Sequence, residues 1–502
     1  MNPVNGDMYL RQYARAGFNL FRFSQKNCSL ALYRDLDHYA VQEAVMVDEL
    51  LQYARKYGFR ICYGLFGYQP VFNDHPDNAE GMAKLKRFVK YSVDRWGAYV
   101  DFWEFLHEQK ADARWYEILT PCLRSLDPYH HPITTSWERP ELPGIEVNAP
   151  HWYAGIRNEL GCDQETAANA RNWKRFNKPV IVGEQGNTAS KEQLQTPGVG
   201  GVWDEKSSLR MRLRNWVALF NEMAFIFWNT SYARDGHSMN IWLGPQERQY
   251  VRAMQDFAQR LDKDVRMAPV TVSDPKTVRG WALASPARAG VYLHHFANHT
   301  NAVSDLSITL EVPKSTPAYW YSPENAAILR RIDVPVGRQS LVVPPFTVDV
   351  ALLLTPDGPP DIDHDGKAND EDLDDDNDGV PDLADAFPLD PEEWADKDGD
   401  LIGDNMDADI DADGVGDDKN KNGIPDFQEM DYDGDGVLKA NAVPWDAFPL
   451  DPKEWRDTDG DGLGDNADPD DDGDGWTDEA ERQAGTDPLD RLSFPRINPP
   501  TG

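Results

Sequence analysis

Two stretches of the chain place a glutamate directly after an apolar segment typical of a buried β-strand. Residues 99–106 are rich in aromatic and β-branched side chains, and His107 and Glu108 follow them. Far downstream, Glu184 follows the apolar residues 180–183 in the same way. Active sites of parallel barrels are built where the strands end. Two carboxylates that meet there could perform acid/base and nucleophilic chemistry on a glycosidic bond.

The surrounding sequence alternates between strand-like and helix-like segments. Strands are predicted at 18–23, 59–64, 99–106, 132–136, 145–149, 180–183 and 224–228. Helices are predicted at 9–17, 39–57, 79–96, 115–126, 166–176 and 208–222. Regular alternation of this kind predicts an α/β fold with a parallel sheet covered by helices.

Seven predicted strands are one fewer than a closed (β/α)8 barrel requires. Either one strand is misassigned, or the first strand lies upstream of Met1 together with any signal peptide, which this chain does not show. We favour the second explanation. We therefore expect residues 1–262 to form a TIM barrel that lacks its first strand.

The motifs at the strand ends resemble those of the retaining glycoside hydrolases of clan A, in particular the cellulase-like family 5. That family's fourth strand ends in Trp-Glu-Leu-x-Asn-Glu, which is similar to residues 103–108 (Trp-Glu-Phe-Leu-His-Glu). Its seventh strand carries Lys-Pro-apolar-Gly-Glu-x-Gly, which is similar to residues 178–186. Smaller signatures follow in the family's order, namely Gly17-Phe18-Asn19 with Arg22, His151-x-Tyr153, and Trp228.

The resemblance implies a role for several of these residues. Glu108 would be the general acid/base and Glu184 the nucleophile of a double-displacement reaction. The pKa of Glu108 would then be raised by burial or by a neighbouring negative charge, so that the acid keeps its proton. Arg22 would keep Glu184 ionised, and Tyr153 would donate a hydrogen bond to it.

Other residues of the resemblance would line the sugar site. His151 would form part of its wall, and Trp228 would be a floor on which a sugar ring stacks. Trp152 is a second stacking candidate, with core packing as an equal alternative, and Glu104 is interpreted as structural. The family has Asn, which hydrogen-bonds the sugar 2-hydroxyl, where this chain has His107. A histidine can donate or accept that bond, but it is bulkier and it titrates, so the chemistry at position 2 stays open.

Residues 265–356 show short alternating strands separated by Pro and Gly turns. The predicted strands are 278–284, 290–296, 307–312, 318–321, 339–343 and 348–354. This pattern predicts a small β-sandwich. Such a domain could pack on the barrel or bind glycan, and packing is the interpretation we prefer.

The net charge of −36 belongs to the C-terminal part of the chain. Residues 361–490 hold 47 acidic and 8 basic residues, whereas the remainder is nearly balanced. An acidic segment repels phosphate groups, which argues against nucleic acid as a partner. No apolar run is long enough to span a membrane. The four widely spaced cysteines favour free thiols over a zinc site or a disulfide framework.

Within residues 361–490 the spacing Asp-x-Asp-x-Asp-Gly recurs with a carboxylate at the twelfth position. In a calcium-binding loop, oxygens at the first, third, fifth and twelfth positions meet, and the glycine makes the turn. Five copies predict the ligands Asp361, Asp363, Asp365 and Asp372; Asp374, Asp376, Asp378 and Asp385; Asp418, Asn420, Asn422 and Glu429; Asp457, Asp459, Asp461 and Asp468; and Asp470, Asp472, Asp474 and Glu481. Weaker copies begin at Asp396, Asp409 and Asp431.

A longer repeat returns residues 385–391 at 446–452, a shift of 61 residues. The segment 361–490 resembles the thrombospondin type 3 repeats of secreted bacterial proteins. A disordered acidic linker is the alternative, but it would not explain the fixed spacing of Asp and Gly. We therefore expect structural Ca²⁺ that turns this segment into a stiff spacer. Since millimolar calcium is an extracellular condition, we expect an extracellular or cell-surface location.

The sequence thus predicts a secreted retaining glycoside hydrolase that cleaves β-glycosidic bonds in a polysaccharide or oligosaccharide. Catalysis would need no cofactor, and the calcium-loaded stalk would reach a cell surface or matrix. The alternative is a non-catalytic glycan-binding or adhesion protein. In that interpretation, His107 and the missing strand indicate an enzyme that has lost its catalytic activity.

Overall fold

The chain forms two compact units, of which the larger comprises mainly residues 6–395 and the smaller mainly residues 406–502. The computed structural model describes residues 10–11, 13–24, 33–36, 38–66, 77–109, 111–136, 139–154, 159–187, 207–227, 231–232, 239–240, 245–369, 371–391, 393–397, 404, 453–456, 458, 463–491, 493 and 495.

Parallel strands form the first half of the larger unit. Four of them make one sheet in the order β1-β4-β5-β6, and three make a second sheet in the order β7-β8-β9. Their bounds are β1 (Leu20–Ser24), β4 (Arg60–Phe66), β5 (Phe102–Leu106), β6 (Ile133–Thr134), β7 (His151–Ala154), β8 (Ile181–Asn187) and β9 (Ala224–Phe227). Every pairing within these two sheets is parallel, as the strand–helix alternation predicts.

The link between the two sheets differs from the sequence prediction. Residues 145–149, the fifth of the seven strands predicted from the sequence, form no regular strand, and Asn148 pairs singly with Val180. The regular ladder begins only at β7. Pro150 lies between them and has no N–H to donate, which explains why the strand starts later than the apolar pattern suggests.

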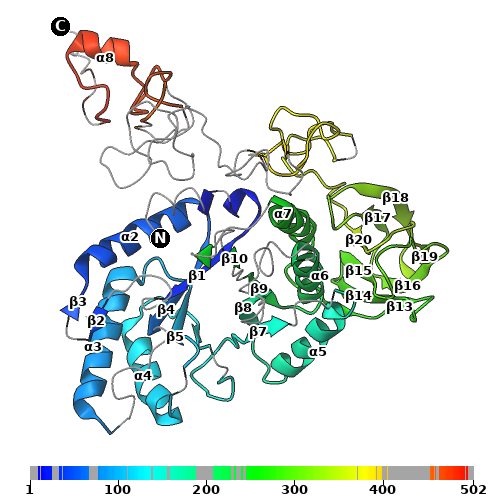
Figure 1. Ribbon diagram of the computed structural model, residues 1–502, viewed down its shortest axis with the longest axis horizontal. Helices are drawn as coiled ribbons and strands as arrows, with labels where there is room; N and C mark the ends of the chain where they lie inside the picture. Colours follow the sequence, from blue (N-terminus) through cyan, green and yellow to red (C-terminus); the bar gives the residue numbers. More distant parts are fainter. Residues whose placement is uncertain are drawn as a thin grey trace. The chain divides into compact units, whose positions relative to one another are not determined.

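Helices cover the outer faces of the two sheets (Figure 1). Next to β1, β4 and β5 lie α2 (Val41–Lys56), α3 (Ala79–Trp96) and α4 (Ala113–Leu126), and next to β7, β8 and β9 lie α5 (Cys162–Lys174), α6 (Ser207–Leu219) and α7 (Pro245–Gln259). The Asn78 side chain accepts from the Gly81 N–H (2.9 Å) and starts α3, and Asp112 starts α4 similarly. The sequence analysis missed α7, although Pro245 at its first position is a start signal.

Short antiparallel hairpins join β2 (Tyr33–Asp35) to β3 (His38–Tyr39) and β10 (Ser231–Tyr232) to β11 (Met239–Asn240). None of these four strands was predicted. Each has two or three residues, which is too short for a periodic pattern to show.

Beyond α7 the chain forms two antiparallel sheets in the orders β12-β14-β15-β20-β17-β18 and β13-β16-β19. Their bounds are β12 (Arg266–Ala268), β13 (Val270–Val272), β14 (Val278–Ala284), β15 (Ala289–His295), β16 (Ser307–Val312), β17 (Thr316–Tyr321), β18 (Ile328–Val334), β19 (Gly337–Val342) and β20 (Asp349–Leu354). The predicted strands 278–284 and 307–312 match β14 and β16 in both bounds. The sequence analysis missed β12, β13 and β18, which are short or largely exposed.

One hydrophobic core joins the barrel helices to this β-rich domain. Trp216 of α6 stacks on Tyr292 of β15 with ring centroids 5.3 Å apart, and both side chains are fully buried. The Tyr321 hydroxyl of β17 donates to the Ala253 carbonyl of α7 (2.9 Å). This face of the β-rich domain therefore packs on the barrel, as the sequence analysis preferred.

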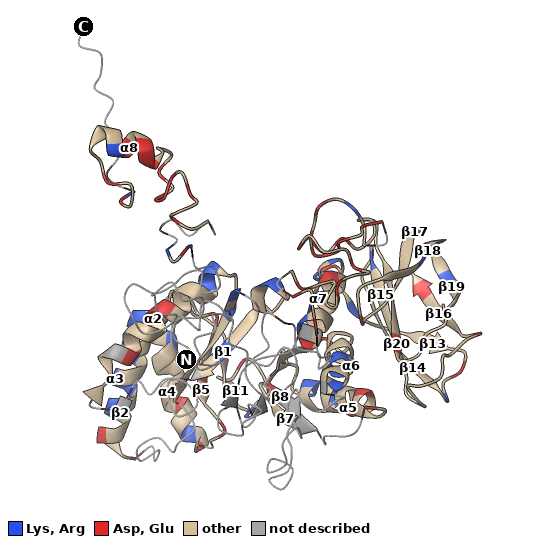
Figure 2. Ribbon diagram, turned by 45° about the horizontal axis from the view of Figure 1, so that its top comes forward, with Lys and Arg blue, Asp and Glu red and all other residues tan. Residues whose placement is uncertain are grey.

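The first part of the acidic segment belongs to the larger unit. Ile362 and Leu389, each 2 % exposed, lie in the same core as Trp216. Figure 2 shows the acidic residues of this part, in red, along the loops that follow β20. The composition changes at residue 361, but the boundary between the units falls near residue 395. The composition changes where the acidic residues begin. The boundary between the units depends instead on the apolar side chains that lie among the acidic residues.

In the smaller unit, the described residues include the helix α8 (Asp478–Ala484). Among the helices that the structure describes, none is both long enough and apolar enough to cross a lipid bilayer.

Candidate active site

Five of the predicted site residues come together near one edge of the parallel strands, either within a strand or just after it. Arg22 lies on β1, His107 and Glu108 follow β5, His151 opens β7, and Glu184 lies on β8. His151 and Glu184 are register partners in the pairing of β7 with β8. In a parallel barrel this edge of the sheet is where reacting groups gather.

Arg22 joins three of the polar side chains at this edge. Its Nε and Nη2 atoms donate to the two carboxylate oxygens of Glu104 at 2.9 and 2.8 Å. Its Nη1 atom donates to Glu184 Oε1 at 2.8 Å, and Nη2 lies 2.7 Å from His107 Nδ1. The guanidinium thus fixes the position of Glu184 by a charge-assisted hydrogen bond.

Glu104 is fully buried and forms a two-point ion pair with Arg22. Burial acts to raise the pKa of Glu104, but the charge and hydrogen bonds of Arg22 outweigh burial and lower it. Burial acts to lower the pKa of Arg22, and Glu104 and Glu184 together raise it. Both groups are therefore charged, and Glu104 holds the Arg22 side chain in place, which agrees with its interpretation as structural.

His107 presents a defined tautomer to the site. A guanidinium can only donate, so the Nδ1 atom of His107 accepts from Arg22, and a neutral ring carries its proton on Nε2. Burial, and then the charge of Arg22, lower the pKa of His107. The ring is therefore neutral at neutral pH, with Nε2–H as a donor.

Glu108 sits on an unusual backbone. Its φ of 48° lies in the left-handed region, which non-glycine residues rarely adopt. The Glu108 N–H donates to Ser136 Oγ (3.0 Å), and that hydroxyl donates to the Leu106 carbonyl (2.8 Å). Through these two hydrogen bonds, Ser136 connects both sides of the turn that changes the direction of the chain after β5. The sequence analysis missed Ser136, and its position at the end of a predicted strand was the only signal.

His151 lies between the two predicted catalytic carboxylates. Its Nδ1 atom lies 2.8 Å from Glu108 Oε1 and 3.5 Å from Glu184 Oε2. Since an ionised carboxylate only accepts, Nδ1 carries the proton of the shorter contact. This hydrogen bond lowers the pKa of Glu108, and burial opposes it more weakly. The expectation that the pKa of Glu108 is raised is thus wrong, because His151 favours the charged form.

The two carboxylates lie close enough to act on one bond. One carboxylate oxygen each of Glu108 and Glu184, and a ring nitrogen of His151, lie within 4.8 Å of one another. The two oxygens are thus at most 4.8 Å apart. This limit is compatible with the roughly 5 Å between a nucleophile and an acid that share an anomeric centre, and it is below the roughly 6.5 Å that an intervening water needs.

Three aromatic residues remain from the predicted substrate site. Trp152 packs against Trp173 of α5 (centroids 6.1 Å apart), with the Arg214 guanidinium of α6 5.3 Å from its ring. Successive strand residues point to opposite faces, so Trp152 faces the helices while His151 faces Glu108 and Glu184. These contacts favour packing, the alternative that was left open for Trp152. The side chain of Tyr153 and the whole of Trp228 lie outside the described residues.

Three predicted calcium loops fall in the described residues and share one hydrogen-bond pattern. In each loop the glycine has a φ between 93° and 99°, and its N–H donates to the aspartate five residues earlier. In each loop the first three predicted ligands bring their carboxylate oxygens within 4.8 Å of one another. These triplets are Asp361, Asp363 and Asp365; Asp374, Asp376 and Asp378; and Asp470, Asp472 and Asp474.

The loop 374–385 fits a divalent cation. Each of its four predicted ligands has a buried carboxylate oxygen without a hydrogen-bond partner among the described residues. Burial, assisted by neighbouring carboxylates, raises the pKa of Asp376 to about 8 and that of Asp385 to about 6. Oxygens gathered in this way are what Ca²⁺ prefers. The loop 470–481 has the same buried oxygens, including both of Glu481.

The loop 361–372 differs at its last position. Lys367 Nζ lies 3.0 Å from Asp365 and 3.2 Å from Asp372, so an ammonium group already offsets these two charges. Of the ligands predicted for the two central loops, only Asp468 is described, and the others lie outside the described residues, namely Asp418, Asn420, Asn422, Glu429, Asp457, Asp459 and Asp461.

Residues 470–491 match the family described as Bacterial TSP3 repeat. None of the curated proteins matches the chain.

Solved structures similar to this chain are described as glycoside hydrolases. One, described only as a glycoside hydrolase, is 13 % identical over 71 % of this chain and 89 % of its own, with a TM-score of 0.50. Another, a glycoside hydrolase family 5 protein from Bacteroides vulgatus, is 12 % identical over 71 % of this chain and 87 % of its own, with a TM-score of 0.50. At this identity the likeness establishes the fold, an α/β TIM barrel similar to that of family 5.

Proposed function

We propose that the chain is a retaining glycoside hydrolase that cleaves β-glycosidic bonds in a polysaccharide or oligosaccharide. The observation that carries the proposal is the pair of carboxylates, Glu108 just after β5 and Glu184 on β8, with oxygens within 4.8 Å of each other. That separation favours a double displacement over direct attack by water.

In the first step, Glu184 attacks the anomeric carbon while Glu108 gives its proton to the glycosidic oxygen. The carbon–oxygen bond of the glycoside breaks, the leaving sugar departs as an alcohol, and an ester forms between the anomeric carbon and Glu184. The Arg22 guanidinium, 2.8 Å from Glu184 Oε1, positions the attacking group.

In the second step, the Glu108 carboxylate takes a proton from water, and the water oxygen attacks the anomeric carbon. The ester breaks, Glu184 leaves as a carboxylate, and Glu108 is again protonated. Arg22 stabilises the charge that returns to Glu184. The double inversion retains the configuration at the anomeric carbon.

Three further side chains complete the proposed sugar site. The Nε2–H of His107 supplies a hydrogen-bond donor for a sugar hydroxyl, whereas an asparagine would supply both a donor and an acceptor. From their place in the family's motifs, Tyr153 and Trp228 are the other two residues that we propose for substrate binding. The protein acts outside the cytoplasm or at the cell surface, and its acidic segment is a Ca²⁺-loaded stalk.

Hydrolysis of a panel of β-linked glycans tests the proposal. Glu184→Gln and Glu108→Gln should each lower kcat by about 10³-fold or more, because each removes a group that acts on the reacting bond. Glu117→Gln, on the exposed face of α4, is the matched control and should keep full activity. If the unmodified chain binds glycans of the panel without cleaving any, the non-catalytic alternative is correct.

A further inference from the structure

We infer that Ca²⁺ bound in the loop 374–385 stabilises the catalytic unit itself, in addition to stiffening the stalk. The inference rests on the calcium-binding part of the proposed function. It goes further by assigning the metal of this loop a structural role in the barrel. The reason is that the segment carrying the ligands also completes the core around α7.

Apolar anchors flank the loop on both sides. Ile362 precedes it and Leu389 follows it, and each is 2 % exposed. Both lie in one core with Phe257 of α7 and Trp216 of α6. If this segment left its place, the apolar surface of those two helices would be exposed to water.

A buried ion pair fixes the same segment to α7. Arg248, whose side chain is 0 % exposed, donates through Nε to Asp390 Oδ2 (2.7 Å), and its Nη2 lies 2.6 Å from that oxygen. Removing one partner of a buried pair leaves an uncompensated charge and is strongly destabilising. Asp390 is only five residues beyond Asp385, the last predicted ligand of the loop.

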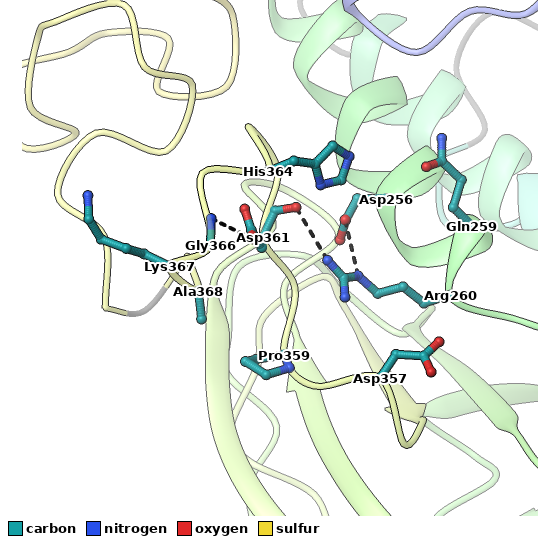
Figure 3. Close-up of a pocket in the computed structure, with 10 residues that line it drawn as sticks. All are labelled: Asp256, Gln259, Arg260, Asp357, Pro359, Asp361, His364, Gly366, Lys367 and Ala368. Atoms are coloured by element: carbon teal, nitrogen blue, oxygen red, sulfur yellow. Dashed lines mark hydrogen bonds and ion pairs between the residues drawn. The ribbon is translucent and has the colours of Figure 1, made fainter.

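The preceding loop is held by α7 as well. Arg252 donates to the Ile362 carbonyl, and Arg260 Nη2 donates to the Asp361 carbonyl (3.3 Å). A pocket of about 430 Å³ lies between the end of α7 and residues 361–368 (Figure 3). In this view Arg260 bridges Asp256 of α7 and the backbone of Asp361. Polar contacts on α7 thus position the chain as it enters the two loops.

Charge repulsion links the metal to these contacts. The carboxylates of Asp374, Asp376 and Asp378 converge within 4.8 Å, and Asp376 is only 8 % exposed. Without a cation, like charges at this distance push the loop open. Since the anchors at Leu389 and Asp390 follow the last ligand closely, an opened loop pulls on the contacts that cover α7. A bound cation removes the repulsion and keeps the core closed.

The loop 470–481 provides an internal control. It repeats the hydrogen bonds of the loop 374–385, and Asp472, which is only 3 % exposed, holds the position of Asp376. It belongs, however, to the smaller compact unit. Its metal should therefore affect the stability of that unit alone.

The test compares the full chain with its Asp376→Asn and Asp472→Asn variants, each in CaCl2 and in EDTA. Calorimetric titration measures Ca²⁺ binding, and scanning calorimetry measures the melting temperature of the larger unit. Hydrogen exchange of residues 245–259 reports directly on α7. For the full chain and for Asp472→Asn, Ca²⁺ should raise that melting temperature by about 5 °C and slow exchange in α7. Asp376→Asn should lose most of both effects.

A second variant separates metal binding from its coupling to the barrel. Leu389→Ala keeps every ligand, so it should bind as many Ca²⁺ ions as the full chain while showing a smaller Ca²⁺-dependent protection of α7. If no Ca²⁺ binds to the full chain, the calcium part of the proposed function fails. If Ca²⁺ binds but α7 exchanges equally fast in CaCl2 and in EDTA, or if Asp376→Asn behaves like Asp472→Asn, the inference alone is overturned.

Discussion

The Nδ1 atom of His151 lies 2.8 Å from Glu108 Oε1, and this hydrogen bond lowers the pKa of the carboxyl group proposed as the catalytic acid. Glu108 must carry a proton to protonate the leaving group. Its lowered pKa therefore places the alkaline limb of the pH profile of kcat/KM in the acidic range. Measuring this profile for the most rapidly cleaved glycan checks the expectation.

His151→Phe tests the cause of that limb. The change removes the donor, so the pKa of Glu108 should rise and the alkaline limb should move to higher pH, even as the maximal rate falls. The same hydrogen bond stabilises the fold above the unfolded-state pKa of Glu108, and this contribution is lost as the pH falls through the lower folded-state pKa. An alkaline limb that stays in place in the variant would show that another group controls it.

Ser136→Ala should impair catalysis although the Ser136 side chain is not proposed to contact the substrate. The hydroxyl ties the Glu108 N–H to the Leu106 carbonyl, so its loss relaxes the turn that holds Glu108 at a φ of 48°. We expect kcat to fall by about 10-fold or more with a smaller change in KM, because a displaced catalytic group affects the reacting geometry. The free energy of unfolding should fall by about 1–3 kcal/mol.

The matched control for this change is Ser125→Ala. Ser125 also donates its hydroxyl to a backbone carbonyl, but it lies on the exposed part of α4. It should leave kcat unchanged. Equal losses of activity in the two serine variants would argue against a positioning role for Ser136.

Glu104→Ala should destabilise the barrel strongly. It leaves the buried Arg22 without the two-point partner that holds its guanidinium. Loss of one partner of a buried pair lowers the free energy of unfolding by about 3–5 kcal/mol. Urea denaturation measures this loss. Combining Glu104→Leu with Arg22→Met should recover part of the stability but not the activity, and a double variant as unstable as the single one would contradict the ion-pair explanation.

Glu481→Gln should weaken Ca²⁺ binding in the C-terminal loop. Both carboxylate oxygens of Glu481 are buried without a hydrogen-bond partner among the described residues, as expected for a bidentate ligand. Titration calorimetry should show one fewer tight Ca²⁺ ion per chain. Glu479→Gln, on the exposed side of α8, should bind the full number, and equal stoichiometry in the two variants would remove Glu481 from the ligand set.

The meeting of Glu108 with Glu184 could be predicted because each comes directly after an apolar strand-like segment of a predicted parallel barrel, and parallel strands of a barrel end at one edge. The geometry of the three described aspartate loops could be predicted because their candidate ligands are close in sequence and the glycine turn is local. In both cases the decisive information lies within about a dozen residues of each site.

What the sequence could not provide depends on contacts between distant residues. The pKa of Glu108 follows from His151, 43 residues away in the chain, and not from burial alone. The direction of Trp152 depends on which face of β7 meets α5 and α6. The burial of Ile362 and Leu389 in the core of the larger unit could not be predicted, because isolated apolar residues in an acidic segment give no periodic signal.

The most direct test of the central claim is covalent trapping of the proposed nucleophile. The chain would be treated with an activated 2-deoxy-2-fluoro β-glycoside of the sugar that it cleaves, and its peptides would be weighed by mass spectrometry. We predict one added fluorosugar per chain, attached to Glu184 and absent from Glu184→Gln. An adduct on a different residue, or turnover that releases the inverted anomer with no adduct, would contradict the account.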